Sequence, residues 1–153
     1  MSLILNIETS TTNCSVSISE NEEIIASQEK NFEYYSHSEV LHVYIVELFS
    51  KSNLEITDIR AVSISEGPGS YTGLRIGSAT AKGICFALKI PLIAIDTMHI
   101  LAKKIKSTKG YIIPNLDAGR NEIYFSVFDC NYKKIQPTNL SLIHISEPTR
   151  PLY

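Results

Sequence analysis

The stretch of sequence that decides the fold is rich in glycine: Glu66-Gly67-Pro68-Gly69-Ser70-Tyr71-Thr72-Gly73-Leu74-Arg75-Ile76-Gly77. An alternating apolar run before it predicts a strand, and a long apolar run after it predicts a helix. Glycine allows sharp turns and close approach of another surface, and such strand–loop–helix junctions either hold anions or act as rigid turns. No Gly-Lys-Ser/Thr follows, which excludes a Walker loop. The residues expected to shape this loop are Gly67, Pro68, Gly69, Ser70, Thr72 and Gly73.

Bulk composition bounds the class of protein. The chain has 153 residues, of which 44% are hydrophobic and 20% charged, as expected for one globular domain or one domain and part of another. No apolar run approaches the roughly 20 residues that span a bilayer. The N-terminus has no basic region typical of a secretory signal, and three widely spaced cysteines indicate reduced thiols, so we expect a cytoplasmic protein.

Charge gives little reason to expect strong binding to nucleic acid. The formal net charge is −2, which offers little attraction for phosphates. One basic cluster stands out, and its spacing is typical of a solvated helix end, where cations oppose the helix dipole. Its members are Lys103, Lys104, Lys106 and Lys109.

Hydrophobic periodicity predicts an α/β order of elements over the first two thirds of the chain. Ser36 and Glu39 have the spacing of a helix capping box. We expect strands at 3–7, 15–19, 23–28 and 61–65, a short buried strand at 91–95, and helices at 37–50, 73–88 and 98–106.

The pattern then restarts. Residues 111–117, like residues 3–8, form an apolar run that ends in an acidic residue and a short polar turn, and 122–128 match 14–19 in position. This repeat predicts a second lobe built on the plan of the first. The expected domains are therefore a first lobe at 1–108 and the beginning of a second at 109–140.

Neither of the two long helices has a polar side. In the helix at 37–50 one stripe is fit to cover a sheet, but the opposite face is apolar as well, and the helix at 73–88 behaves in the same way. The missing part of a second lobe is one candidate cover, and a partner subunit is the reading we favour. The predicted partner surface comprises Val43, Val46, Glu47, Ile76, Ala79, Gly83 and Phe86.

Candidate chemistry is sparse. Glu8 and Asp117 lie at equivalent points of the two half-repeats, so they could flank one cleft as paired carboxylates, or simply support turns. With Thr9 and Ser10 they form the predicted nucleotide cleft. His37 and His42 are five residues apart, about 140° around a helix, which is poor for one metal, so we expect no metal site.

The residues together resemble the TsaB (YeaZ) family, whose members are bacterial subunits of the machinery that makes threonylcarbamoyladenosine at position 37 of tRNA. The matching pieces are Leu5 to Ser10, Ser36 to Glu39, the glycine loop running into Gly77, and Leu116 to Tyr124. The resemblance spans about residues 3–139. It implies an actin/hsp70/sugar-kinase-like lobe with a five-stranded mixed sheet and helices, plus the start of a second similar lobe.

The resemblance also implies a role without chemistry. The metal-binding histidines of the related catalytic subunit, TsaD, would fall near Thr97 and Leu101, and the carboxylates of its first phosphate turn near Thr12 and Asn13. None of these residues replaces the groups required. We therefore expect a non-catalytic subunit that supports TsaD, contacts a TsaE-type ATPase and can form a homodimer.

Two alternatives and one anomaly remain. A small actin-like ATPase or kinase is the alternative function, and ATP or ADP could bind between lobes or subunits although no cofactor is required. A metallopeptidase is the third reading, which the missing metal motif disfavours. Family members carry a complete second lobe, whereas residues 141–153 resemble translated adapter DNA, so we expect a non-native tail that includes His144 and Arg150.

Overall fold

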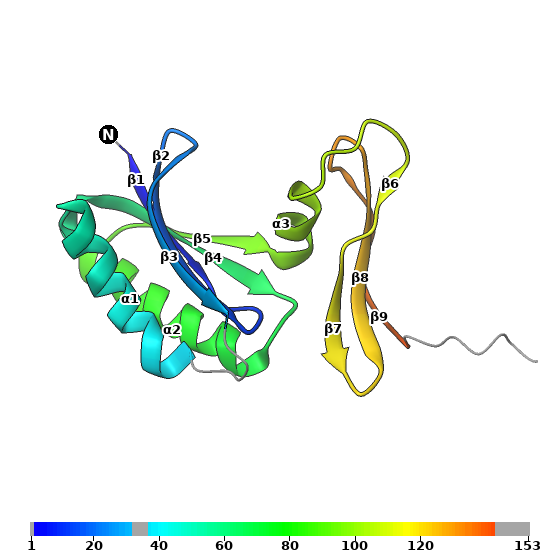
Figure 1. The fold of residues 1–153 in the computed structure, drawn as a ribbon, viewed down its shortest axis with the longest axis horizontal. Helices are drawn as coiled ribbons and strands as arrows, with labels where there is room; N and C mark the ends of the chain where they lie inside the picture. Colours follow the sequence, from blue (N-terminus) through cyan, green and yellow to red (C-terminus); the bar gives the residue numbers. More distant parts are fainter. Residues whose placement is uncertain (1, 32–36, 143–153) are drawn as a thin grey trace, which may run out of the picture. The chain divides into compact units, whose positions relative to one another are not determined.

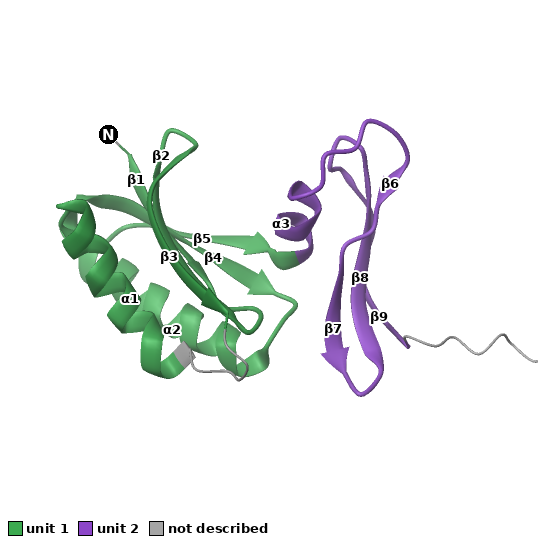
Figure 2. Ribbon diagram, viewed as in Figure 1, with its two compact units in different colours: residues 1–97 green, residues 98–153 purple. Residues whose placement is uncertain are grey.

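A computed structural model describes residues 2–31 and 37–142 of the chain. The chain divides into two compact units, residues 1–97 and 98–153 (Figure 2). This division assigns the helix after the fifth strand to the second unit, whereas the sequence-based boundary lies at residue 108.

The first unit contains a five-stranded mixed sheet (Figure 1). The central strand β1 pairs with β2 in antiparallel and with β4 in parallel orientation. β3 extends the sheet beyond β2, and β5 extends it in parallel beyond β4. The predicted five-stranded mixed sheet of an actin-like lobe is therefore confirmed. Its strands are β1 (Leu3–Glu8), β2 (Asn13–Glu20), β3 (Glu23–Asn31), β4 (Ile59–Gly67) and β5 (Leu92–Asp96).

Two helices, α1 (His37–Ser52) and α2 (Tyr71–Leu88), cover one face of this sheet (Figure 1). The alternation along β1 explains the core, since Leu3, Leu5 and Ile7 are buried while their neighbours are only half-buried. The stripe predicted to cover the sheet is confirmed in α1, where Leu41 and Leu48 are buried in the same core.

The other face of the sheet is polar along β1, β2 and β4. The Asn6 side chain donates to Ser17 Oγ (3.2 Å) and Ser19 Oγ (3.0 Å), and its Oδ1 accepts from Ser63 Oγ (2.6 Å). These side-chain hydrogen bonds tie β1, β2 and β4 together in addition to the backbone ladder.

One local expectation needs correction. The strand at 91–95, predicted to be buried, is an edge strand, and Ile93 and Ile95 are 39% and 37% exposed. The connector after α1 contains a 3-10 turn, η1 (Ile56–Asp58), in which Glu55 and Asp58 form a reciprocal capping box. The capping box predicted at Ser36 lies outside the described residues.

The second unit pairs helix α3 with a four-stranded antiparallel sheet. β8 is bonded to the other three strands. The apolar run at 111–117 forms two strands, β6 and β7, which are separated at Pro114, a residue without an N–H for a ladder. Phe128 is fully buried beside Met98, and its ring meets that of His99 edge-on at 5.5 Å. The elements are α3 (Thr97–Lys103), β6 (Tyr111–Ile112), β7 (Asn115–Gly119), β8 (Glu122–Asp129) and β9 (Lys134–Leu142).

Further features concern the tail, the thiols and membranes. Ser141 and Leu142 pair with β8, while the rest of the predicted non-native tail, with His144 and Arg150, lies outside the described residues. All three cysteines are free, and burial raises the pKa of the Cys14 thiol to about 11. Among the helices described, none has the length and apolar character needed to cross a membrane.

Candidate docking surface

The glycine loop is joined to the turn between β1 and β2. Ser70 N donates to Ser10 O at 2.6 Å, and Thr9 Oγ1 donates to Gly73 O at 2.8 Å. One Glu8 oxygen accepts from Ser10 N (2.7 Å) and from Ser65 Oγ (2.8 Å). These bonds fix the start of α2 relative to β1 and β4.

The loop also caps α2. Ser70 is the N-cap, and its hydroxyl accepts from Gly73 N at 3.2 Å, which satisfies one of the donors that a helix start leaves free. Gly67 has φ +116°, a conformation that favours glycine. Thr72 is exposed. The loop therefore has the features of the rigid turn, one of the two readings of its sequence.

Two glycines allow this close packing. A Cβ on Gly69 would lie 2.5 Å from Ser10 O, and a Cβ on Gly77 would collide with Thr9 Oγ1. Packing inside the chain therefore requires glycine at both positions, since real Cβ atoms do not approach other atoms so closely. The turn after β1 and the first two turns of α2 are therefore packed tightly against each other.

The outward faces of α1 and α2 are apolar and uncovered within the first unit. Val46 is 69% exposed and Phe86 is 89% exposed, although both are large hydrophobic side chains. Val43 is half exposed, and Ala79 and Gly83 are exposed as well. Large exposed apolar patches are uncommon in monomers and mark binding surfaces.

A groove of about 680 Å³ lies between the two helices. His42 Nε2 and Thr80 Oγ1 meet across the helix pair at 3.4 Å. Four of the predicted partner residues line the groove, namely Val46, Ile76, Ala79 and Gly83. The sequence analysis did not find the other lining residues, which are Ser38, His42, Ile45, Ile56, Thr80 and Ile84.

The remaining predicted partner residues lie outside the groove lining. Val43 and Phe86 belong to the same outward faces but do not line the groove. The Glu47 Oε2 accepts from Gln28 Nε2 on β3 (2.8 Å) and from Lys51 Nζ, one turn further along α1 (3.1 Å). These bonds hold the pKa of the Glu47 carboxyl below its ordinary value. Glu47 therefore has an internal partner set, unlike the apolar members of the surface.

The fold of the first unit does not require glycine at position 83, which lines the groove. A Cβ at Gly83 would have no atom within 4 Å, so no contact inside the chain requires glycine there. Because glycine in a helix costs roughly 0.5–1 kcal/mol relative to alanine, Gly83→Ala should stabilise the first unit by about that amount in chemical unfolding. The matched Gly77→Ala should destabilise it, and destabilisation by both variants would contradict this account.

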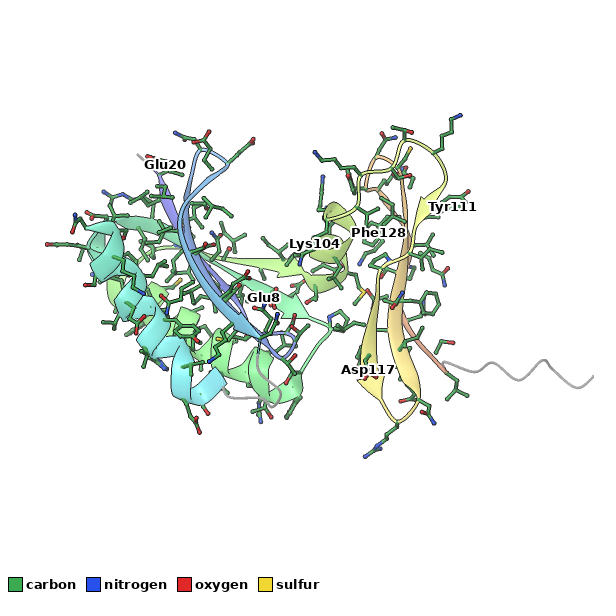
Figure 3. All side chains as sticks on the ribbon, in the orientation of Figure 1. Glu8, Glu20, Lys104, Tyr111, Asp117 and Phe128 are labelled. Atoms are coloured by element: carbon green, nitrogen blue, oxygen red, sulfur yellow. The ribbon has the colours of Figure 1, made fainter. Side chains whose placement is uncertain are left out.

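The predicted nucleotide cleft is drawn from both units. Thr9 and Ser10 are 2% and 3% exposed, and their polar groups are used in the bonds to the glycine loop. Asp117 lies on β7 in the second unit, where its Oδ1 accepts from Gly119 N at 2.8 Å (Figure 3). Glu8 and Asp117 therefore each support a local turn, and their pairing in one cleft stays a prediction.

No set of metal ligands gathers in residues 2–31 and 37–142, where no three His, Cys, Asp or Glu side chains come together. Thr97 and Leu101, the positions aligned with the TsaD histidines, both lie in α3. Neither side chain carries an imidazole.

Comparison with known proteins gives the family. A family model described as TsaD: tRNA N6-adenosine threonylcarbamoyltransferase matches residues 24–144. The tRNA threonylcarbamoyladenosine biosynthesis protein TsaB of Buchnera aphidicola (subsp. Acyrthosiphon pisum, strain APS) is 33% identical over 87% of this chain and 60% of its own length. The protein of the same name from Escherichia coli K12 is 29% identical over 82% of this chain and 54% of its own. The chain thus spans just over half the length of these relatives.

Solved structures agree on the fold. YeaZ from Pseudomonas aeruginosa superposes with a TM-score of 0.79 at 22% identity, covering 100% of this chain and 72% of its own. The ethanolamine utilization protein EutJ from Carboxydothermus hydrogenoformans superposes with a TM-score of 0.58 at 12% identity, covering 93% and 52%. Together with the family match and the named relatives, these likenesses show that the chain belongs to the tRNA N6-adenosine threonylcarbamoyltransferase family and, within it, to the TsaB (YeaZ) group.

Proposed function

We propose that this chain is a non-catalytic subunit in the synthesis of N6-threonylcarbamoyladenosine at position 37 of tRNA, and that it docks a TsaD-type catalytic subunit. The observation that carries the proposal is the apolar groove between α1 and α2, with exposed Val46 and Phe86 on the faces beside it. The names of the relatives supply the pathway.

The chemistry of the surface favours a folded protein as the occupant. Burying an exposed valine or phenylalanine is worth roughly 1.5–3 kcal/mol before the costs of association. Ala79 and Gly83 lie on α2, where small residues permit a second backbone to approach closely. A helix from a partner would fill such a groove in the way that helices pack ridges into grooves.

The residues of this chain favour a non-catalytic role. A TsaD-like metal site needs imidazoles, which Thr97 and Leu101 do not carry. The alternative of an ATPase or kinase gains no support from the turn after β1, because Thr9 and Ser10 are buried and bonded internally. Nucleotide binding, contact with a TsaE-type ATPase and homodimerisation stay predictions.

Phe86 tests the proposal. Truncation of an exposed aromatic should change the free energy of unfolding by less than about 0.5 kcal/mol. As an interface anchor, however, Phe86→Ala should weaken binding of the cognate TsaD-type subunit by about 2 kcal/mol, or roughly 30-fold, in calorimetric titration.

Tyr71→Ala is the matched control. Tyr71 is 71% exposed on the same helix, fifteen residues from Phe86 and therefore about 22 Å along the axis. Equal losses from both variants would remove the groove region as the centre of the interface. Failure of the unmodified chain to bind any TsaD-type subunit would overturn the proposed function.

A further inference from the structure

The modest net charge conceals a strong asymmetry between the two units. Residues 1–97 contain six Lys and Arg against twelve Asp and Glu, whereas residues 98–153 contain eight against four. The first unit is therefore acidic and the second basic. Such asymmetry is a recognised sign of interaction with nucleic acid or another polyanion.

Most of the described basic residues of the second unit lie on two segments that contact each other, the segment from Lys103 to Lys109 and the turn between β8 and β9. Tyr132, in the turn between β8 and β9, donates from its hydroxyl to Ile105 O at 2.9 Å. Lys103 Nζ lies 4.1 Å from the centroid of the Tyr132 ring. These contacts bring Lys133, the next residue along that turn, close to the segment that follows α3.

The loop that enters β6 adds to the same end of the sheet. Tyr111 pairs with Asp129, and Asp129 N donates to Lys133 O at 3.0 Å. Lys109 lies two residues before Tyr111 and is exposed. We refer to the exposed residues Lys103, Lys104, Lys106, Lys109 and Lys133 as the lysine patch; Figure 3 labels Lys104 and Tyr111.

The segments that carry the patch contain no acidic residue. Neither residues 97–116 nor residues 130–142 contain an Asp or Glu. The nearby Asp129 uses its Oδ1 to accept from Asn131 N and Lys133 N, both at 2.9 Å. Within the part of the chain that the structure describes, none of the five lysines forms an ion pair with a carboxylate.

The helix-end explanation covers only part of the patch. α3 ends at Lys103, and two further turn-like bonds follow, from Lys104 N to Leu101 O and from Ile105 N to Ala102 O. The field of a helix dipole falls off within the last turn, so Lys106 and Lys109 lie beyond its reach. Lys133 is on a different element altogether.

We propose that the lysine patch binds the phosphate backbone of RNA. Lysine ammonium groups contact phosphates without reading sequence, and each contact releases counterions. Tyr111 is 69% exposed beside the patch, which provides an aromatic ring for a base to stack on. The combination of cations and an exposed aromatic favours RNA over an acidic protein or a membrane surface.

The choice of RNA as the ligand rests on the proposed function. The lysine patch would give the chain a direct contact with the RNA that the complex modifies.

The test uses the whole chain alone and follows the fluorescence anisotropy of a fluorescein-labelled tRNA anticodon stem–loop. Between about 50 and 200 mM salt, the logarithm of the binding constant should fall linearly with the logarithm of salt concentration.

The decisive variant is Lys104→Gln/Lys133→Gln, which removes one cation from each segment. Its salt dependence should be less steep by about 1.5 and its affinity weaker by about tenfold. The control Arg60→Gln/Lys82→Gln changes the net charge equally with two exposed residues of the first unit and should match the unmodified chain. Lys104→Arg/Lys133→Arg should restore binding.

The outcomes separate this proposal from the docking of TsaD. Loss of RNA binding together with retained co-elution with the TsaD-type subunit supports the lysine patch as an RNA surface. No RNA binding at low salt, an equal loss in the control, or equal binding to phosphatidylserine vesicles would overturn it. Loss of co-elution in the patch variant would also overturn it by assigning the patch to a protein interface, whereas failure of the unmodified chain to co-elute leaves the RNA result standing.

Discussion

Val46→Arg is expected to abolish co-elution with the cognate TsaD-type subunit while the chain stays folded. Val46 is 69% exposed and lines the groove between α1 and α2, so its side chain contributes little to the core. An arginine buried in an apolar interface without a counter-charge costs about 3–5 kcal/mol, which corresponds to at least a 100-fold loss of affinity. The measurement is size-exclusion chromatography of the mixed proteins, with circular dichroism to verify folding.

Ile24→Arg is the control for that variant. Ile24 is 67% exposed, nearly the same as Val46, but it lies on β3 and outside the groove. The change of size and charge is equivalent, so only the position differs. If Ile24→Arg also prevents co-elution, the loss reflects added charge and the groove is not the docking surface.

Gly69→Ala should be the most destabilising of the glycine substitutions. The added methyl group would lie 2.5 Å from Ser10 O, a backbone atom that accepts the hydrogen bond from Ser70 N. The clash cannot be relieved by rotating a side chain, so either the loop or the turn after β1 must move. We expect a loss of about 3 kcal/mol, which lowers the melting temperature of a domain of this size by roughly 12 °C or more.

Gly83→Ala accompanies Gly69→Ala as a matched substitution, since it adds the same methyl group where no atom is near. An unchanged melting temperature for Gly69→Ala would show that the glycine loop is not held against Ser10. It would also remove the basis for treating the loop and the turn as one packed unit.

The fold of the first unit could be predicted because two strong periodicities agree. Alternation in β1 and helical stripes in α1 and α2 both report which side chains face the core, and Leu5 and Leu41 are fully buried as expected. Periodicity does not report which strand lies at the edge of a sheet. Ile93 and Ile95 were therefore predicted to be buried, whereas β5 has only β4 as a neighbour.

The docking surface could be predicted only in part, for a related reason. A stripe on one helix identifies residues such as Val46 and Ala79, but a groove forms between elements. Ile56 contributes to the groove from η1, which lies between the predicted helix at 37–50 and the predicted strand at 61–65. An isoleucine among Glu55, Thr57 and Asp58 was the available signal. Glu47 was included by its place on the helix, yet Gln28 and Lys51 provide it with internal partners.

The second unit shows why total charge is a poor guide to the local charge of a surface. The value of −2 led to an expectation of weak attraction for nucleic acid, because summation cancels opposite signs that belong to separate units. Tyr132 brings Lys103 and Lys133 together through contacts that no linear spacing reveals.

The opposite charges of the two units also govern how the chain behaves on charged supports. The sequence isoelectric point is about 6.1, which suggests a protein that anion exchangers retain near neutral pH. The lysine patch of the second unit nevertheless presents cations to a sulfonated resin, whereas the excess of Asp and Glu in the first unit favours a quaternary amine. Retention on either column will therefore follow which unit meets the bead, rather than the average charge of the molecule.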